Sequence, residues 1–80
     1  MTGKQKIKLI RENDWRDVTF KYKDGYGIIM PDNIDPSFFT IAYGEIVFKD
    51  KDYEKVINAP IFDGKSLLDI ADELTEVEAL

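Results

Sequence analysis

The clearest alternation of apolar and polar side chains covers residues 18–22. Val, Phe and Tyr alternate there with Thr and Lys, which is the period of a half-buried strand. Asp24 and Gly25 follow, and this dipeptide is a strong hairpin signal because glycine adopts the positive φ of the turn. The pattern predicts a β-hairpin whose second strand covers residues 26–30.

Two registers of this hairpin fit the pattern. A two-residue loop pairs Phe20 with Ile29. A three-residue loop through Tyr26 pairs Phe20 with Met30 instead and gathers the apolar side chains on one face. We favour the three-residue loop, although a shift of one residue would move every side chain of a strand to the opposite face.

A second hairpin is predicted after a loop. Residues 31–37 contain two prolines, two aspartates and an asparagine, which favour turns and interrupt strand pairing. Residues 38–50 then alternate again on both sides of a turn near Gly44. This segment therefore predicts two further strands.

Two short helices flank the predicted strands. Residues 4–12 are strongly basic and carry a narrow apolar stripe, which predicts a helix that packs by one edge. Residues 51–60 predict another short helix, with Asp50 or Asp52 as its N-cap and Pro60 at its end.

The C-terminal segment carries the strongest helical pattern of the chain. Its apolar residues recur at helical spacing: Leu67, Ile70, Ala71, Leu74 and Val77. Acidic residues occupy the opposite face: Asp69, Asp72, Glu73 and Glu76. The pattern predicts a long amphipathic helix.

These elements predict a single α+β domain over residues 1–80. Its centre is a small four-stranded, mainly antiparallel sheet made of the two hairpins. The N-terminal helix, the short helix and the long C-terminal amphipathic helix pack on one face of this sheet, which buries the apolar stripe of each element.

The composition limits the chemistry that the chain can perform. Of its 80 residues, 44% are hydrophobic and none is cysteine or histidine. Without them the chain lacks a thiol nucleophile, the commonest general base and the usual ligands of structural zinc. We therefore expect a protein that is not an enzyme and that binds no cofactor or metal.

Gly64, Lys65 and Ser66 resemble the end of a phosphate-binding loop. That motif requires a glycine five positions before Gly64, where this chain has Ala59, and it follows a strand. Ser66 and Asp69 fit a capping box instead, in which each residue bonds the backbone of the other. The segment is interpreted as a helix start and not as a nucleotide site.

Asp50, Asp52 and Glu54 have the spacing with which a calcium-binding loop opens. Such a loop needs glycine at its sixth position and glutamate at its twelfth, where this chain has Lys55 and Ile61. The calcium interpretation fails, and exposed acids at a helix start explain the pattern.

No part of the sequence predicts a membrane segment. No apolar run approaches the roughly 20 residues that span a bilayer. The basic N-terminus lacks the apolar core of a secretory signal. We expect a cytoplasmic protein.

The net charge of −5 is unevenly distributed. Residues 1–25 carry seven Lys or Arg against four Asp or Glu, whereas residues 26–80 carry four against twelve. An acidic majority disfavours a general nucleic-acid binder, because neutralising phosphates dominates that affinity.

The leading hypothesis is a small protein-interaction module, an adaptor or an inhibitor, that binds another protein. The predicted contact residues are the acids of the C-terminal helix and three aromatic residues near turns: Asp69, Asp72, Glu73, Glu76, Tyr26, Phe38 and Phe39. The acids would attract a basic partner, and aromatic side chains supply large, stiff contact areas. Homodimerisation is also compatible with this sequence.

The alternative hypothesis is a nucleic-acid binder that uses the basic N-terminal helix and the first hairpin. The phosphate contacts would be Lys4, Lys6, Lys8, Arg11, Lys21 and Lys23. Tyr22 or Tyr26 would stack on a base.

Two stretches resemble a known group of sequences. They are Trp15–Phe20, at the entry to the first strand, and Phe62–Leu67, at the entry to the predicted C-terminal helix. Together they resemble short, uncharacterised proteins of Gram-positive bacteria and their phages or mobile elements, over most of the chain. The resemblance implies a bacterial, cytoplasmic setting and a link to mobile elements, and it brings no activity or functional residue.

Overall fold

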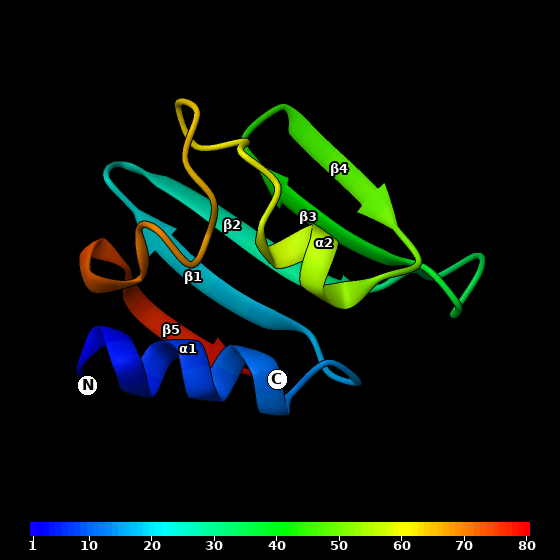
Figure 1. The fold of residues 1–80 in the computed structure, drawn as a ribbon, viewed down its shortest axis with the longest axis horizontal. Helices are drawn as coiled ribbons and strands as arrows, with labels where there is room; N and C mark the ends of the chain where they lie inside the picture. Colours follow the sequence, from blue (N-terminus) through cyan, green and yellow to red (C-terminus); the bar gives the residue numbers. More distant parts are fainter.

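Five strands form one antiparallel sheet in the spatial order β4-β3-β2-β1-β5 (Figure 1). The computed structural model describes all residues, 1–80. The strands are β1 (Val18–Tyr22), β2 (Gly25–Pro31), β3 (Phe39–Tyr43), β4 (Ile46–Asp50) and β5 (Thr75–Ala79). The first four follow one another as a meander, and the end of the chain returns to place β5 beside β1.

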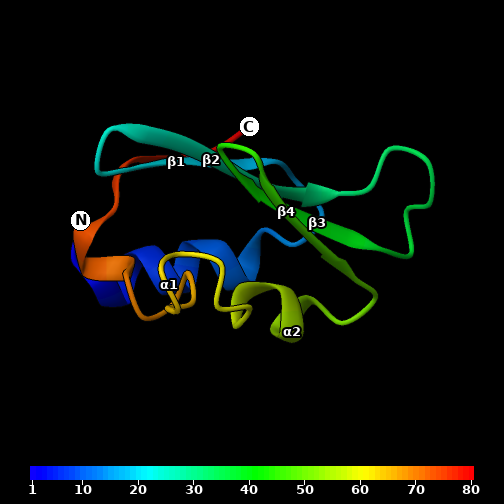
Figure 2. The same cartoon turned by 90° about the horizontal axis from the view of Figure 1, so that it is seen from above.

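The helices lie together on one face of this sheet (Figure 2). They are α1 (Gly3–Glu12), α2 (Tyr53–Ile57) and the short 3-10 helix η1 (Ala71–Glu73). A capping box starts α1, because the Thr2 hydroxyl accepts from the Gln5 N–H and the Gln5 side chain accepts from the Thr2 N–H. Asp52 caps α2 by accepting from the N–H of Glu54 at 3.0 Å, so Asp50 is not the cap.

The prediction of four strands and a long C-terminal helix is wrong. The reciprocal Ser66–Asp69 bonds are present, with the two backbone N–H groups 3.0 and 3.2 Å from their acceptors. They open only one turn, closed by the Ile70 N–H on the Ser66 carbonyl. The chain then tightens into η1, ends it at Leu74 and extends into β5.

Tertiary packing explains why a helical pattern ends as a strand. Leu67, Ile70 and Leu74 are fully buried, as an inward-facing stripe requires. The segment that follows Leu74 also pairs with the outer edge of β1. Apolar and polar side chains alternate over residues 75–79, which suits a strand at the edge of a sheet. Val77 and Ala79 pack toward the core. Helix propensity is a weak preference that such packing overrides.

Both registers considered for the first hairpin are wrong. The loop consists of Lys23 and Asp24, so Gly25 already belongs to β2 and Phe20 pairs with Gly27. A side chain on Gly27 would overlap the ring of Phe20, with an added Cβ only 2.4 Å from its Cε2 and Cζ atoms. The register is therefore set by the space that the aromatic ring needs.

The core lies between the sheet and the helical layer. It contains Phe20, Ile29 and Ile41 from the sheet and Ile10 and Phe62 from the opposite side, all at most 1% exposed. Burial of such side chains supplies the main driving force for folding. No helix of the structure has the length and apolar character needed to cross a membrane.

Candidate functional site

The two faces of the sheet differ in what covers them. Val18, Phe20 and Ile29 point toward the helices and are fully buried. Their neighbours along the strands point to the other side, where Figure 2 shows no helix or loop over the centre of the sheet. A sheet with one uncovered face is expected to carry polar residues there.

The uncovered face is apolar at its centre. Pairing places Ile28 beside Ala42 and Ala42 beside Val47, so one apolar row crosses three strands. Met30 and Tyr26 flank this row on β2. We call these residues the open face: Tyr26, Ile28, Met30, Ala42 and Val47. Tyr26 is 64% exposed and Val47 is 63% exposed.

A shallow hollow lies within the open face. Tyr26, Gly27, Ile28, Ala42 and Gly44 line it, with a volume of about 280 Å³. The small residues leave this space between the larger side chains. A contiguous apolar surface of this kind is a common mark of a protein-binding site.

Charged side chains surround the open face. The ammonium group of Lys21 lies 5.5 Å from the ring centroid of Tyr26. The Tyr26 hydroxyl donates to Glu76 at 3.3 Å. Two more charged residues lie on the edge strands: Lys49 on β4 pairs with Thr40, and Glu78 on β5 pairs with Thr19. The rim therefore carries both signs of charge.

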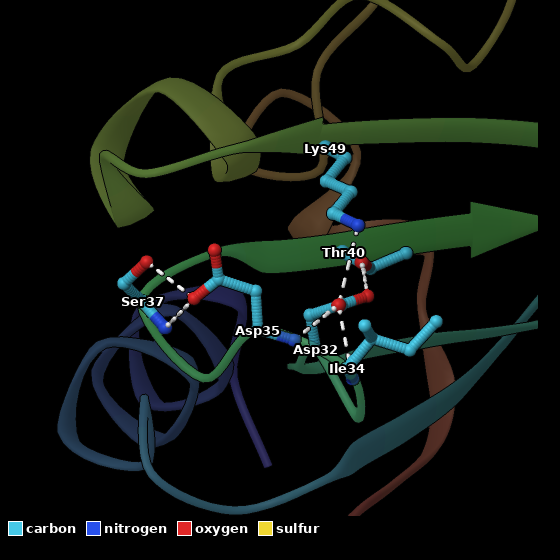
Figure 3. Close-up of polar contacts among 6 residues, drawn as sticks. All are labelled: Asp32, Ile34, Asp35, Ser37, Thr40 and Lys49. Atoms are coloured by element: carbon cyan, nitrogen blue, oxygen red, sulfur yellow. Dashed lines mark hydrogen bonds and ion pairs between the residues drawn. The ribbon is translucent and has the colours of Figure 1, made fainter.

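The loop between β2 and β3 is anchored beside the open face (Figure 3). One carboxylate oxygen of Asp32 accepts from the N–H groups of Ile34 and Asp35, at 3.2 and 2.9 Å. The other accepts from the Thr40 hydroxyl, and Lys49 forms an ion pair with Asp32 at 3.2 Å. The Asp35 N–H, and then Lys49, hold the pKa of Asp32 below its usual value.

A second carboxylate fixes the tip of the same loop. Asp35 accepts from the hydroxyl of Ser37 at 2.6 Å and from its N–H at 3.1 Å, as Figure 3 shows. The Ser37 hydroxyl is the main reason that the pKa of Asp35 is lowered. Ile34 projects from this braced loop and is 92% exposed.

The acids predicted as a single partner-binding face lie on different parts of the fold. Asp69, Asp72 and Glu73 lie in the helical layer, and all three are exposed. Glu76 belongs to β5 and reaches across to Tyr26 on the open face. The Ser66 N–H bonds Asp69 and lowers its pKa. No single helix face presents these acids, because the long helix does not form.

The three predicted aromatic contacts also separate. Tyr26 is exposed on the open face. Phe38 is half-buried beneath two ammonium groups, 5.4 Å from Lys49 and 5.3 Å from Lys51. Phe39 packs edge-on against Tyr53 with ring centroids 5.1 Å apart, so it belongs to the margin of the core.

Sequence reasoning missed most of the open face. The three-residue loop favoured by the sequence predicts Ile28 and Met30 on the buried side, because it places them opposite Tyr22 and Phe20. The signal that could have corrected this is the pair Gly25 and Gly27, which leaves room for aromatic rings on one face of β2.

The basic residues of the nucleic-acid hypothesis do not form one surface. Tyr22 is buried at 3% exposure, so it cannot stack on a base. Lys6 is occupied by a bond to the Leu74 carbonyl in the helical layer. Lys21 lies on the opposite side of the sheet, beside Tyr26.

The stretch that resembles a phosphate-binding loop is a tight turn. Asp63 and Gly64 both have positive φ, 55° and 82°, and the backbone groups of Phe62 and Lys65 exchange two bonds of 3.0 Å. This is the geometry of a two-residue hairpin loop of the Asp-Gly type. The segment closes the helical layer over the core.

Comparisons with protein-family models, with curated protein sequences and with solved structures found no match to this chain.

Proposed function

We propose that this protein is a small, non-enzymatic interaction module that binds another protein through its open face. One observation carries the proposal: an apolar row runs across three neighbouring strands on a side of the sheet that no helix covers. An apolar centre with a charged rim is the usual anatomy of a protein interface.

The geometry of the open face suits a flat or gently convex partner. Tyr26 supplies a large aromatic side chain at one end, and such residues contribute strongly to binding energy. The charged rim would select a partner with complementary charges and steer its approach. The rim consists of Lys21, Lys49, Glu76 and Glu78. The open face takes the place of the acidic helix predicted from the sequence, because that helix does not form.

We further propose a cytoplasmic setting in a Gram-positive bacterium, with a link to a phage or another mobile element. This part rests on the resemblance of Trp15–Phe20 and Phe62–Leu67 alone. Adaptor and inhibitor roles both fit a chain of 80 residues that offers one apolar face.

A variant-controlled pull-down tests the role of the open face. The tagged protein is incubated with a Gram-positive lysate, with and without nuclease, and captured proteins are identified by mass spectrometry. Ile28→Lys places a charge at the centre of the open face and should reduce capture of the true partner at least tenfold, about 1.4 kcal/mol.

A matched pair of charge reversals supplies the control. Lys21→Glu changes the rim of the open face, whereas Lys8→Glu changes an exposed lysine on α1. Capture should fall with Lys21→Glu and stay unchanged with Lys8→Glu. Equal capture by the wild type and Ile28→Lys would overturn the proposal, and capture that nuclease abolishes would favour a nucleic-acid ligand.

A further inference from the structure

The two edge strands of the sheet differ in whether they can accept another strand. β5 pairs with β1 irregularly, because the register shifts between Thr19 and Lys21 and Glu76 has φ of 51°. Bulges and exposed charges are common devices that prevent edge strands from pairing. β4 has no such irregularity, since all five of its residues pair in register with β3.

The first half of β4 is also apolar, and its charged residues Lys49 and Asp50 lie in the second half. Ile46 is 48% exposed on the helix side of the sheet, and Val47 is 63% exposed on the open face. A regular edge strand with exposed apolar residues on both faces is a template for pairing with another strand. In Figure 1, β4 forms one outer margin of the sheet with no segment beyond it.

The direction of the backbone groups on β4 follows from its hairpin. The loop that begins at Gly44, with φ of 60°, has two residues, and such loops are closed by a hydrogen-bonded pair, here Tyr43 and Ile46. In an antiparallel pair the bonding direction alternates along the strand. The N–H and C=O groups of Val47 and Lys49 therefore point away from β3.

We propose that a second copy of this chain pairs with β4 in antiparallel orientation, about a twofold axis at Val47. The two five-stranded sheets then form one continuous sheet. Both helical layers lie on the same side, and the two open faces join on the other. This interface is formed by the backbone edge of β4, whereas the partner proposed above contacts side chains of the open face. Val47 belongs to both surfaces, so the tests below measure self-association of the purified chain with no partner present.

The side chains of β4 complement themselves in this register. Val47 lies opposite Val47 of the second copy, Ile46 lies opposite Phe48, and Glu45 lies opposite Lys49. Apolar residues thus meet apolar residues, and each carboxylate meets an ammonium group. Cross-strand pairs of these kinds stabilise a sheet, whereas like charges directly opposite destabilise it.

Neighbouring registers lack this complementarity. A shift by one pairing step in one direction places Ile46 opposite Asp50, and a further step places Lys49 opposite Lys49. A step in the other direction places Val47 opposite Glu45, so only the register centred on Val47 places Ile46, Val47 and Phe48 all opposite apolar residues. Five residues on each side bury less than the roughly 1,200 Å² of a stable interface, so we expect a weak, concentration-dependent dimer.

Sedimentation velocity and NMR on the full chain test the dimer directly. The sedimentation coefficient should rise with concentration from micromolar to millimolar. A mixture of labelled and unlabelled protein should show an intermolecular contact between the Hα atoms of Ile46 and Phe48, which lie opposite each other without bonding in this register. A contact of Phe48 with itself would instead show the wrong register and overturn the axis at Val47.

Val47→Pro blocks the edge without removing a bond inside the protein. The N–H that it deletes points to solvent, and proline is tolerated on edge strands in that orientation. This variant should keep the circular dichroism spectrum of the wild type and remain monomeric. Ile28→Lys is the matched control, because it changes the open face away from the edge and should dimerise as the wild type does.

Charge reversal gives a test that does not depend on proline. Glu45→Lys and Lys49→Glu each place two like-charged pairs across the axis and should each lose self-association. Lys49→Glu also removes the ion pair with Asp32, so Glu45→Lys is the variant whose loss of self-association reports on the axis alone. An equimolar mixture of the two variants places opposite charges across both contacts and should recover the dimer. A wild type that stays monomeric at millimolar concentration, a dimer that survives Val47→Pro, or a mixture that fails to associate would each overturn the proposal.

Discussion

The ring of Phe20 lies directly over the backbone of Gly27 on the neighbouring strand. The two residues pair across β1 and β2, and a Cβ atom at position 27 would lie 2.4 Å from the ring and 2.9 Å from the Ala42 carbonyl oxygen. Phe20 is fully buried and also packs edge-on against Phe62, with centroids 6.0 Å apart. The missing side chain of Gly27 thus makes room for the central aromatic residue of the core.

Gly27→Ala should destabilise the protein by about 1–3 kcal/mol, because the added methyl group overpacks a site that cannot expand. Urea unfolding followed by circular dichroism measures the change. Combining it with Phe20→Leu provides the control. The smaller side chain makes room for the methyl group, so the two substitutions together should cost less than the sum of their separate effects. Strictly additive effects would contradict this packing.

The same relationship shows why the register of the first hairpin could not be predicted from its pattern. Two Asp-Gly dipeptides occur in the chain, and only Asp63 and Gly64 form the tight turn that this dipeptide favours. Asp24 and Gly25 do not form this turn, because the packing of the Phe20 ring over Gly27 fixes a different register. The loop then consists of Lys23 and Asp24, and Lys23 has the positive φ, 54°. Local turn preference is worth less than the placement of a buried aromatic ring.

The C-terminal segment gives a second case in which local pattern and tertiary packing disagree. The inward residues were predicted correctly, since Leu67, Ile70 and Leu74 are buried. Their secondary structure was not, because the spacing of three or four residues also fits successive tight turns. Residues 75–79 form a strand because the edge of β1 is available for pairing, and the pattern of one segment carries no information about that edge.

The open face could not be predicted from the sequence either, because it also depends on how the strands pair. Ile28 and Met30 are strongly apolar, and a pattern alone assigns such residues to the core. Only the pairing of Phe20 with Gly27 shows that they point away from it. The exposure of Tyr26 is predictable from the sequence, because a residue beside a turn is often exposed and a turn is a local feature.

Acid should destabilise the protein through Asp32. Its pKa is lowered in the folded state by the Asp35 N–H and by Lys49, so the ionised carboxylate stabilises the fold. That contribution is complete above the unfolded pKa of about 3.9 and is lost as the pH falls through the lower folded value. Thermal unfolding of the wild type and Asp32→Asn over a pH series measures it.

Asp32→Asn should be less stable than the wild type at neutral pH, because the amide cannot replace a carboxylate that accepts three hydrogen bonds and pairs with Lys49. The gap between the two proteins should narrow as the pH falls below about 4. A gap that stays constant across this range would show that the charge of Asp32 contributes nothing.

Tyr53 should make the protein sensitive to alkali. Burial raises the pKa of its phenol, and the hydroxyl donates to the Ile10 carbonyl at 2.7 Å. A raised folded pKa means that this stabilisation is complete below the unfolded value of about 10 and is lost as the pH rises through the folded value. Tyr53→Phe should lose about 1 kcal/mol at neutral pH.

Above the unfolded pKa of tyrosine, the wild type should lose stability more steeply than Tyr53→Phe, so their unfolding free energies should converge. Urea unfolding at neutral and alkaline pH makes the comparison. Parallel losses in both proteins would assign the alkaline effect to other residues.

Arg16 should control whether the last strand stays attached to the sheet. Its guanidinium group donates to the carbonyl oxygens of Leu80 at 2.6 Å and Ala79 at 3.2 Å, and the Leu80 N–H bonds the Asp17 carbonyl. β5 is short and irregularly paired, so these bonds are a large share of what holds it. Arg16→Ala should therefore speed hydrogen exchange of the β5 amides by at least tenfold, about 1.4 kcal/mol, while the amides of β2 change less.

Arg16→Lys is the control for geometry, because it keeps the charge but lacks the planar fork that reaches both carbonyls. It should recover only part of the protection, and full recovery would show that charge alone holds the strand.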